Sequence, residues 1–187
     1  MRIVAGDFGG RRLAAVPGRA TRPTTDKVKE ALFNIIGPYF DGGHALDLYA
    51  GSGGLAIEAV SRGVGSATLI DRQYAAIKTI SQNIAVTKAP ERFAVYKQDA
   101  VKALYILGKR SQHFSLIFLD PPYAKQKIVR DMILISQLEL ALPGCLCVAE
   151  TNQAANLPDQ VGSWQLTRRQ EYGITVLNIY HFEGESS

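Results

Sequence analysis

The chain of 187 residues has few of the side chains that bind metals or form disulfides, with two cysteines and three histidines in all. Cys145 and Cys147 alternate with apolar residues, so they are expected on one face of a strand, as core residues and not as a disulfide or a metal pair. His44, His113 and His181 are scattered along the sequence. A protein metal site needs several such ligands close together, and the sequence therefore predicts no metal site.

The sequence also lacks a long hydrophobic run. No segment approaches the roughly 20 apolar residues that a membrane-spanning helix needs, and residues 1–7 lack the apolar stretch of a signal peptide. Hydrophobic residues make up 47% of the chain and charged residues 20%, which is typical of a compact globular domain. We therefore expect a single cytoplasmic domain over residues 1–187, with residues 1–20 as an N-terminal extension of the main body 21–187, and we expect a monomer.

Most of the chain carries no net charge. Residues 1–30 hold seven basic and three acidic side chains, and their net charge of +4 equals the formal net charge of the whole chain. The pattern of residues 2–13 fits a small β-hairpin that presents Arg11 and Arg12 to the phosphates of a nucleic acid. The alternative is an ordinary edge strand whose charges prevent edge-to-edge pairing.

Apolar runs alternate with helical patterns through the rest of the chain. Strands are expected from residue 44 and over residues 67–71, 92–97, 114–119, 145–150, 164–169 and 174–182. Helices are expected over residues 54–62, 74–86, 101–109 and 126–142, after an earlier helix with apolar spacing over 28–39 that Thr24, Thr25 or Asp26 can cap. This order predicts an α/β fold with a Rossmann-like, mostly parallel sheet of about seven strands and an antiparallel C-terminal edge.

The segment Asp120-Pro121-Pro122-Tyr123 follows the apolar run 114–119. The exocyclic amine of a nucleobase is flat and a poor nucleophile, because its lone pair is delocalised into the ring. An Asp120 oxygen and a carbonyl of the Pro121-Pro122 step can each accept one N–H of such an amine, and Tyr123 offers a flat face on which a base can stack. We interpret the segment as a site that methylates an amino group. For the tetrapeptide alone, the alternative is a Pro-Pro turn with a solvent-exposed acid.

A glycine-rich turn, with Gly51 and Gly53, lies between the strand that starts at residue 44 and the helix 54–62. Glycines let the main chain approach a ligand closely at a helix N-terminus. The spacing of Gly51, Gly53 and Ala56 also fits dinucleotide-binding enzymes. Asp47, four residues before Gly51, favours a cationic sulfonium or ammonium group over a pyrophosphate.

Two further acids end or follow strands. Asp71 ends the strand 67–71 at the spacing of a ribose-binding carboxylate. Asp99 follows the strand 92–97, where it can accept from an adenine amino group while Ala100 lines the ring; its alternative role is the N-cap of the next helix. Because the C-terminal ends of parallel strands share one sheet edge, Asp47, Asp71, Asp99 and Asp120 are expected to lie along one edge.

Four blocks of the sequence together resemble the bacterial small-subunit ribosomal RNA guanine-N2 methyltransferases of the RsmD type. The resemblance covers nearly the whole chain, and its most specific block is Arg22-Pro23-Thr24-Thr25-Asp26. The other blocks are Arg2-Ile3-Val4-Ala5-Gly6 with Gly10-Arg11-Arg12-Leu13, Leu46-Asp47-Leu48-Tyr49-Ala50-Gly51-Ser52-Gly53, and Asp120-Pro121-Pro122-Tyr123. Some members carry Glu in place of Asp71 and Phe in place of Tyr123.

The resemblance implies transfer of a methyl group from S-adenosylmethionine to N2 of one guanine in 16S ribosomal RNA, free or in the small subunit, by direct in-line displacement without a metal. The implied catalytic residues are Asp120, Pro121, Pro122 and Tyr123. The expected cofactor contacts are Asp47, Tyr49, Gly51, Gly53, Asp71, Arg72, Asp99, Ala100 and Thr24, and the expected RNA contacts are Arg11, Arg12, Arg22, Lys125 and Lys127.

Two other functions fit parts of the sequence. A DNA adenine or cytosine amino methyltransferase would share the chemistry of Asp120, although such an enzyme usually needs a target-recognition domain for which 187 residues leave little room. An assembly factor that binds ribosomal RNA without catalysis would keep the basic N-terminal residues but has no need of Asp120 or Tyr123.

Overall fold

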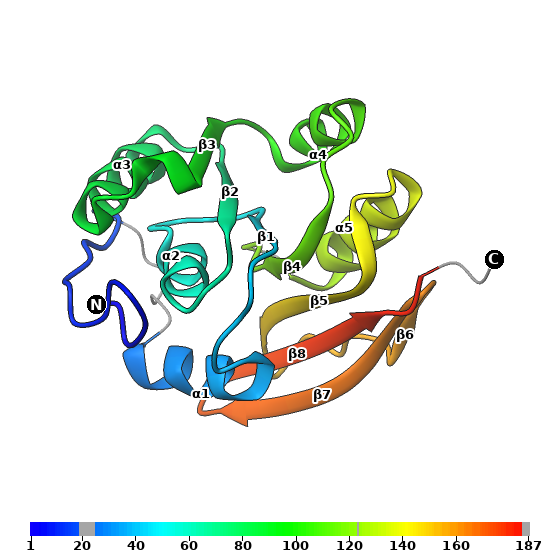
Figure 1. The fold of residues 1–187 in the computed structure, drawn as a ribbon. Helices are drawn as coiled ribbons and strands as arrows, with labels where there is room; N and C mark the ends of the chain where they lie inside the picture. Colours follow the sequence, from blue (N-terminus) through cyan, green and yellow to red (C-terminus); the bar gives the residue numbers. More distant parts are fainter. Residues whose placement is uncertain (19–24, 123, 185–187) are drawn as a thin grey trace. The chain divides into compact units, whose positions relative to one another are not determined.

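The structure is a computed structural model, and it describes residues 1–18, 25–122 and 124–184. The chain divides into two compact units, Met1–Asp99 and Ala100–Ser187. Each unit is an α/β arrangement of its own strands and helices (Figure 1). None of the helices within the described ranges is long and apolar enough to cross a membrane.

The first unit contains three parallel strands in the order β3-β2-β1. They are β1 (His44–Asp47), β2 (Ser66–Asp71) and β3 (Phe93–Lys97). Helix α2 (Gly54–Ser61) and helix α3 (Tyr74–Thr87) connect them and pack on them, and a short 3-10 turn, η1 (Pro90–Arg92), precedes β3 (Figure 1). Nearly every residue of β1 and β2 is buried, as expected for parallel strands covered by helices.

Helix α1 (Asp26–Ile36) precedes the strands of this unit. Of the three expected capping residues, Thr25 is the N-cap, and its hydroxyl accepts a hydrogen bond from the Val28 N–H at 3.2 Å. Leu32 and Phe33 form its fully buried face. The helix ends before residue 39, where the apolar spacing had placed its end, because the segment Gly37-Pro38 interrupts it; proline has no N–H and disfavours helix in the residue before it.

The N-terminal segment, defined here as residues 1–14, packs on the other elements of the first unit. Its expected hairpin is reduced to one antiparallel bridge, Arg2 with Arg12. Ile3 donates to the Arg11 carbonyl at 2.9 Å, and Gly10 donates to the Ile3 carbonyl at 2.8 Å. The segment buries three apolar side chains, Ile3, Phe8 and Leu13. Their packing offsets the lack of a longer run of hydrogen bonds between the two arms of the hairpin.

Buried charges fasten the N-terminal segment to α1 and α2. The Glu58 carboxylate is fully buried and accepts from the N–H groups of Val4 at 2.8 Å and Ala5 at 3.1 Å. Its oxygens also lie 3.5 Å from the Lys29 ammonium and 2.8 Å from Arg62 Nε. Burial lowers the pKa of Lys29, and the neighbouring Glu58 acts in the opposite direction. Removal of one partner would leave a buried charge unpaired, which is strongly destabilising.

The second unit contains five strands in the order β4-β5-β8-β7-β6. They are β4 (Phe114–Leu119), β5 (Ala141–Asn152), β6 (Gln160–Val161), β7 (Trp164–Tyr172) and β8 (Thr175–Phe182). Strands β4 and β5 are parallel, whereas β8, β7 and β6 pair antiparallel. The antiparallel C-terminal edge is therefore confirmed, and the short β6 brings the described strands to eight, against about seven expected.

The largest differences from the predicted boundaries in this unit concern the end of α5 and the start of β5. Helix α5 (Ala124–Gln137) ends five residues before residue 142, and Glu139 adopts a left-handed φ of 57° beyond it. Strand β5 begins at Ala141 and includes Pro143-Gly144, which the sequence had placed in a turn. The register of β5 with β4 shifts between Phe114 and Leu116, and this irregularity accommodates a proline that cannot donate a ladder hydrogen bond. Cys145 and Cys147 are buried core residues, as predicted, and burial raises the pKa of both thiols.

Candidate active site

The glycine turn follows β1 directly. Asp47 ends β1 and is 2% exposed, and the turn leads into α2 at Gly54. Gly51 and Gly53 have left-handed φ values of 58° and 82°. A Cβ added at Gly53 would lie 3.1 Å from Leu69 Cδ2, so both the φ angle and the close packing favour glycine there. Tyr49, the other expected contact in this stretch, is half-buried.

Asp71 lies at the end of β2 and is tied to this turn. Its Oδ2 accepts a hydrogen bond from the Gly51 N–H at 3.0 Å, and its Oδ1 accepts from the Gln73 N–H at 2.9 Å. The carboxylate is 6% exposed. The structure thus brings Asp71 and Gly51 together, and it gives the carboxylate a role that the sequence did not indicate: Asp71 fixes the main chain of the turn. Arg72, next to it, is exposed.

The segment that follows β3 is hydrogen-bonded to the C-terminal end of β2. Gln98 donates its N–H to the Asp71 carbonyl at 3.1 Å. Asp99 is exposed and lies directly before Ala100, the first residue of α4 (Ala100–Lys109). In the first unit, the ends of β1, β2 and β3 therefore gather the expected cofactor residues from Asp47 to Asp99.

Asp120 follows β4 in the second unit, as predicted. The four residues before it are buried, whereas Asp120 itself is exposed. Pro121 is buried and Pro122 is exposed. The carboxylate therefore stands at the C-terminal end of a rigid strand, where a substrate can approach it. Tyr123 and two other expected site residues, Thr24 and Arg22, lie outside the described residues.

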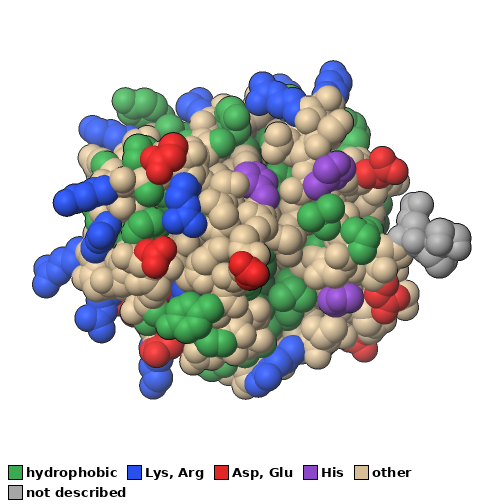
Figure 2. Space-filling model, in the orientation of Figure 1, with side chains coloured by type: hydrophobic (Ala, Val, Ile, Leu, Met, Phe, Trp, Pro, Cys, Tyr) green, Lys and Arg blue, Asp and Glu red, His purple; other side chains and the backbone are tan. Residues whose placement is uncertain are grey.

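The two neighbouring arginines of the N-terminal segment differ in their surroundings. Arg11 donates from one guanidinium nitrogen to the carbonyls of Val86 at 3.0 Å and Thr87 at 2.9 Å, and its guanidinium carbon lies 5.4 Å from the centre of the Phe8 ring. Arg11 thereby binds the last turn of α3, where carbonyls lack helical partners. Arg12 is exposed. Figure 2 shows Lys and Arg side chains along the side of the view that α3 and the N-terminal segment occupy in Figure 1.

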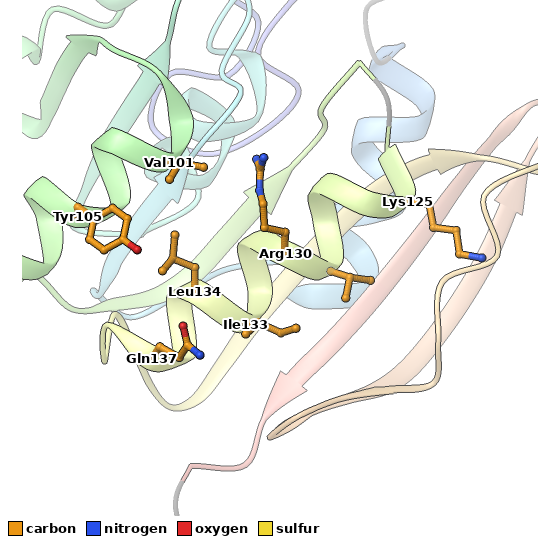
Figure 3. A pocket seen from close by; sticks show the side chains of 8 residues that line it. Val101, Tyr105, Lys125, Arg130, Ile133, Leu134 and Gln137 are labelled. Atoms are coloured by element: carbon orange, nitrogen blue, oxygen red, sulfur yellow. The ribbon is translucent and has the colours of Figure 1, made fainter.

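The remaining expected RNA contacts lie in the first turn of α5, where Lys125 is exposed and Lys127 is half-buried. Lys125 also lines a pocket of about 690 Å³ on α4 and α5 (Figure 3). The lining is mostly apolar and consists of Val101, Tyr105, Lys125, Val129, Arg130, Ile133, Leu134 and Gln137. Its lining contains no carboxylate and does not include Asp47, Asp71, Asp99 or Asp120, so this pocket does not coincide with the strand ends that carry the predicted site.

Asn83 on α3 is a further residue of this region that the sequence did not indicate. This side chain is 1% exposed and joins the glycine turn to the N-terminal segment through hydrogen bonds. A signal was present, because Asn83 lies between the buried Ile80 and Ile84 on the inner face of the helix. A buried amide on an apolar helix face needs partners, but the sequence does not say which.

Comparison with known proteins identifies the family. A family model described as "Conserved hypothetical protein 95" matches residues 1–181. The chain is 46% identical to the "Putative rRNA methyltransferase YlbH" of Bacillus subtilis over 98% of this chain and 100% of that protein. It is 30% identical to the "Ribosomal RNA small subunit methyltransferase D" of Escherichia coli over 99% of this chain and 91% of that protein. The chain belongs to this RsmD-type methyltransferase family.

A solved structure supports the same assignment. The putative methyltransferase yhhF from Escherichia coli is 30% identical to this chain and superposes with a TM-score of 0.84 over 99% of both chains. The resemblance to the RsmD-type family, stated from four sequence blocks, is therefore confirmed, and so is the Rossmann-like α/β fold.

Proposed function

We propose that this RsmD-type protein transfers a methyl group from S-adenosylmethionine to the exocyclic N2 of one guanine in 16S ribosomal RNA of the small subunit. The observation that carries the proposal is Asp120, an exposed carboxylate followed by two prolines at the C-terminal end of the buried strand β4. The names of the two relatives support ribosomal RNA as the substrate. The chemistry of Asp120 supports an amino group as the methyl acceptor.

The glycine turn of the first unit suits S-adenosylmethionine. Positive φ angles at Gly51 and Gly53 and the lack of a side chain at both positions let the main chain approach a ligand closely. The Asp47 carboxylate at the end of β1 suits the positive charge of a sulfonium or an α-ammonium group. Asp71 holds the turn, and Asp99 and Ala100 are proposed to contact the adenine ring. When bound, the cofactor supplies an activated methyl group.

Because the methyl group is already activated, the protein has to orient and polarise the amine. We propose that Asp120 accepts one N–H of guanine N2 and that the carbonyl of Pro121 accepts the other, so that the nitrogen lone pair is available for in-line attack. Pro122 stiffens this loop, and Tyr123 is proposed to stack on the base. As the N–CH3 bond formed, the S–CH3 bond of the cofactor would break and S-adenosylhomocysteine would leave. The nitrogen would then be cationic, and Asp120 would take up the proton that it releases.

Arg12, Lys125 and Lys127 are the described candidates for phosphate contacts in this proposal. Arg12 and Lys125 are exposed, and Lys127 is half-buried in the first turn of α5. Arg22 remains a candidate from the sequence. Arg11 is the weakest of the set, because its guanidinium already binds the carbonyls of Val86 and Thr87.

The test compares Asp120→Ala with the control variant Asp159→Ala. Asp159 is another acid of the second unit, and its side chain is 79% exposed. Among the ion pairs of the described residues, it pairs only with Arg169, at 3.7 Å. We expect Asp120→Ala to lower the methyl-transfer rate by about 10² or more, the usual effect of losing a group that polarises the reacting atoms. Affinity for S-adenosylhomocysteine should stay the same in both variants. Normal turnover by Asp120→Ala would contradict the proposed role.

A further inference from the structure

Asn83 connects two parts of the first unit that have different proposed ligands. Its Nδ2 donates to the carbonyl of Ser52 at 2.8 Å, in the glycine turn, and to the carbonyl of Ala14 at 3.0 Å, in the N-terminal segment. Its Oδ1 accepts from the Ala14 N–H at 2.8 Å. All three bonds are made to main-chain atoms, so the amide fixes the position of one backbone against the other.

A second contact joins the same two segments. The Ser52 hydroxyl lies 3.9 Å from the sulfur of Met1, and a Cβ added at Gly54 would lie 3.3 Å from that sulfur. The Met1 carbonyl in turn accepts from the Leu13 N–H at 2.9 Å. The glycine turn therefore contacts the N-terminal segment at both of its ends, directly at Met1 and through Asn83 at Ala14. Ala14 lies two residues after Arg12 in the sequence.

We propose that Asn83 is a positioning residue that couples cofactor binding in the glycine turn to RNA binding by the N-terminal segment. The inference rests on the proposed function, because both the contact of the glycine turn with the cofactor and the contact of this segment with RNA belong to it. RNA held at Arg12 restrains Ala14, and through Asn83 it restrains the Ser52 carbonyl. A cofactor that binds the turn then loses less conformational entropy, and the same argument holds in the reverse order.

The choice of residue supports this role. An amide offers two donors and an acceptor on one short side chain. The NH2 group of Asn83 donates to both segments, and its oxygen accepts from the N-terminal segment. Thr79, one helical turn earlier on α3, is also buried, at 3% exposure, but its hydroxyl donates to the Ala75 carbonyl of its own helix at 3.0 Å. Thr79→Val is therefore a matched control that removes a buried hydrogen bond on the same helix without touching either segment.

The test measures coupling instead of activity. The dissociation constant of S-adenosylhomocysteine is determined with and without unmodified small ribosomal subunits, and the affinity for subunits is determined with and without S-adenosylhomocysteine. We expect the wild-type protein to show a mutual gain of at least about five-fold, equal in both directions. Asn83→Ala and Asn83→Asp should bring this ratio close to one, and Thr79→Val should keep it. An unchanged ratio in folded Asn83 variants would overturn the proposal.

Hydrogen exchange of the wild-type protein tests the same point if the Asn83 variants do not fold. S-adenosylhomocysteine alone should slow exchange at Leu13 and Ala14, and subunits alone should slow exchange at Gly51 and Gly53. Absence of both effects would contradict the coupling. Two outcomes separate the two proposals. If subunits bind equally well to the Arg12→Ala variant, the proposed RNA contact is wrong. If both ligands bind the wild-type protein independently, only the coupling is wrong.

Discussion

The Asp71 carboxylate holds the main chain of Gly51 through a hydrogen bond of 3.0 Å from the Gly51 N–H to Oδ2. The other oxygen accepts from the Gln73 N–H at 2.9 Å. One buried side chain at the end of β2 therefore fixes both the glycine turn after β1 and the start of the segment that leads to α3. The shape of the proposed cofactor site depends on this acid even if it makes no contact with a ribose.

Asp71→Asn should weaken both the fold and the cofactor site. The asparagine side chain keeps one oxygen for two N–H donors, and its NH2 group then faces the second donor. An unsatisfied buried donor costs about 1–3 kcal/mol, so we expect a loss of that size in the free energy of unfolding, together with weaker binding of S-adenosylhomocysteine. Urea unfolding and a ligand titration would measure the two effects. An equally stable variant with unchanged affinity would show that the turn does not depend on Asp71.

Gly6→Ala and Gly10→Ala form a matched pair that tests the docking of the N-terminal segment. The two glycines have nearly equal φ values of 85° and 86°, so an alanine at either carries the same left-handed strain of roughly 1–2 kcal/mol. A Cβ at Gly6 would lie 1.9 Å from the Ser61 carbonyl oxygen, whereas a Cβ at Gly10 meets nothing within 4 Å. Thermal unfolding should show a much larger loss for Gly6→Ala. Equal losses would mean that the segment does not pack on α2 as described.

Arg11→Ala and Arg12→Ala should affect different properties. Loss of Arg11 leaves the Val86 and Thr87 carbonyls without their guanidinium donor, and we expect lower stability. Loss of the exposed Arg12 should leave stability unchanged, weaken binding to ribosomal RNA, and reduce the slope of log K against log salt concentration by about 1, as for one lost phosphate contact. Binding measured over a salt series, alongside unfolding curves, distinguishes the two. A salt slope that changes only with Arg11→Ala would reverse these assignments.

Tyr180 predicts a dependence of stability on alkaline pH. Its ring is fully buried and its hydroxyl donates to the Pro158 carbonyl at 2.6 Å, and burial raises its pKa from 10.0 to about 12. The folded protein therefore keeps this proton when the unfolded chain has lost it. Its contribution is complete below pH 10 and declines as the pH rises toward 12, by up to about 3 kcal/mol at 1.36 kcal/mol per pH unit.

The measurement is urea unfolding of the wild-type protein and of Tyr180→Phe at several pH values from 9 to 12. The difference in stability between the two should shift in favour of the phenylalanine variant as the pH rises, because phenylalanine has no proton to lose. A difference that stays constant over this range would contradict the raised pKa.

Much of the fold could be predicted because the signals are local. The apolar run 114–119 gave β4 at its observed bounds, and the acids that follow or end strands lie at the ends of β1 to β4 as expected. The end of α5 could not be predicted, because the apolar pattern continues past Gln137 while the backbone turns at Glu139. The start of β5 was missed because Pro143-Gly144, which favours a turn, is accommodated by a register shift against β4.

The contacts that fasten the N-terminal segment could not be predicted at all. Glu58 meets Val4 across 54 positions of sequence, and Asn83 meets Ala14 across 69. Such pairs leave no periodic pattern, and each residue alone looks like an ordinary member of its helix. For the same reason the sequence could mark Asp71 as a site residue by its position at a strand end but could not assign its carboxylate to the Gly51 N–H.

The most direct test of the proposed function is transfer of a labelled methyl group from S-adenosylmethionine to small ribosomal subunits, free 16S RNA and duplex DNA, all lacking the modification. The labelled product is then digested to nucleosides and separated. The account predicts label in ribosomal RNA, as N2-methylguanosine at a single position, and none in DNA. Label in DNA alone, in a methylated adenine or cytosine, or in no substrate at all would contradict it.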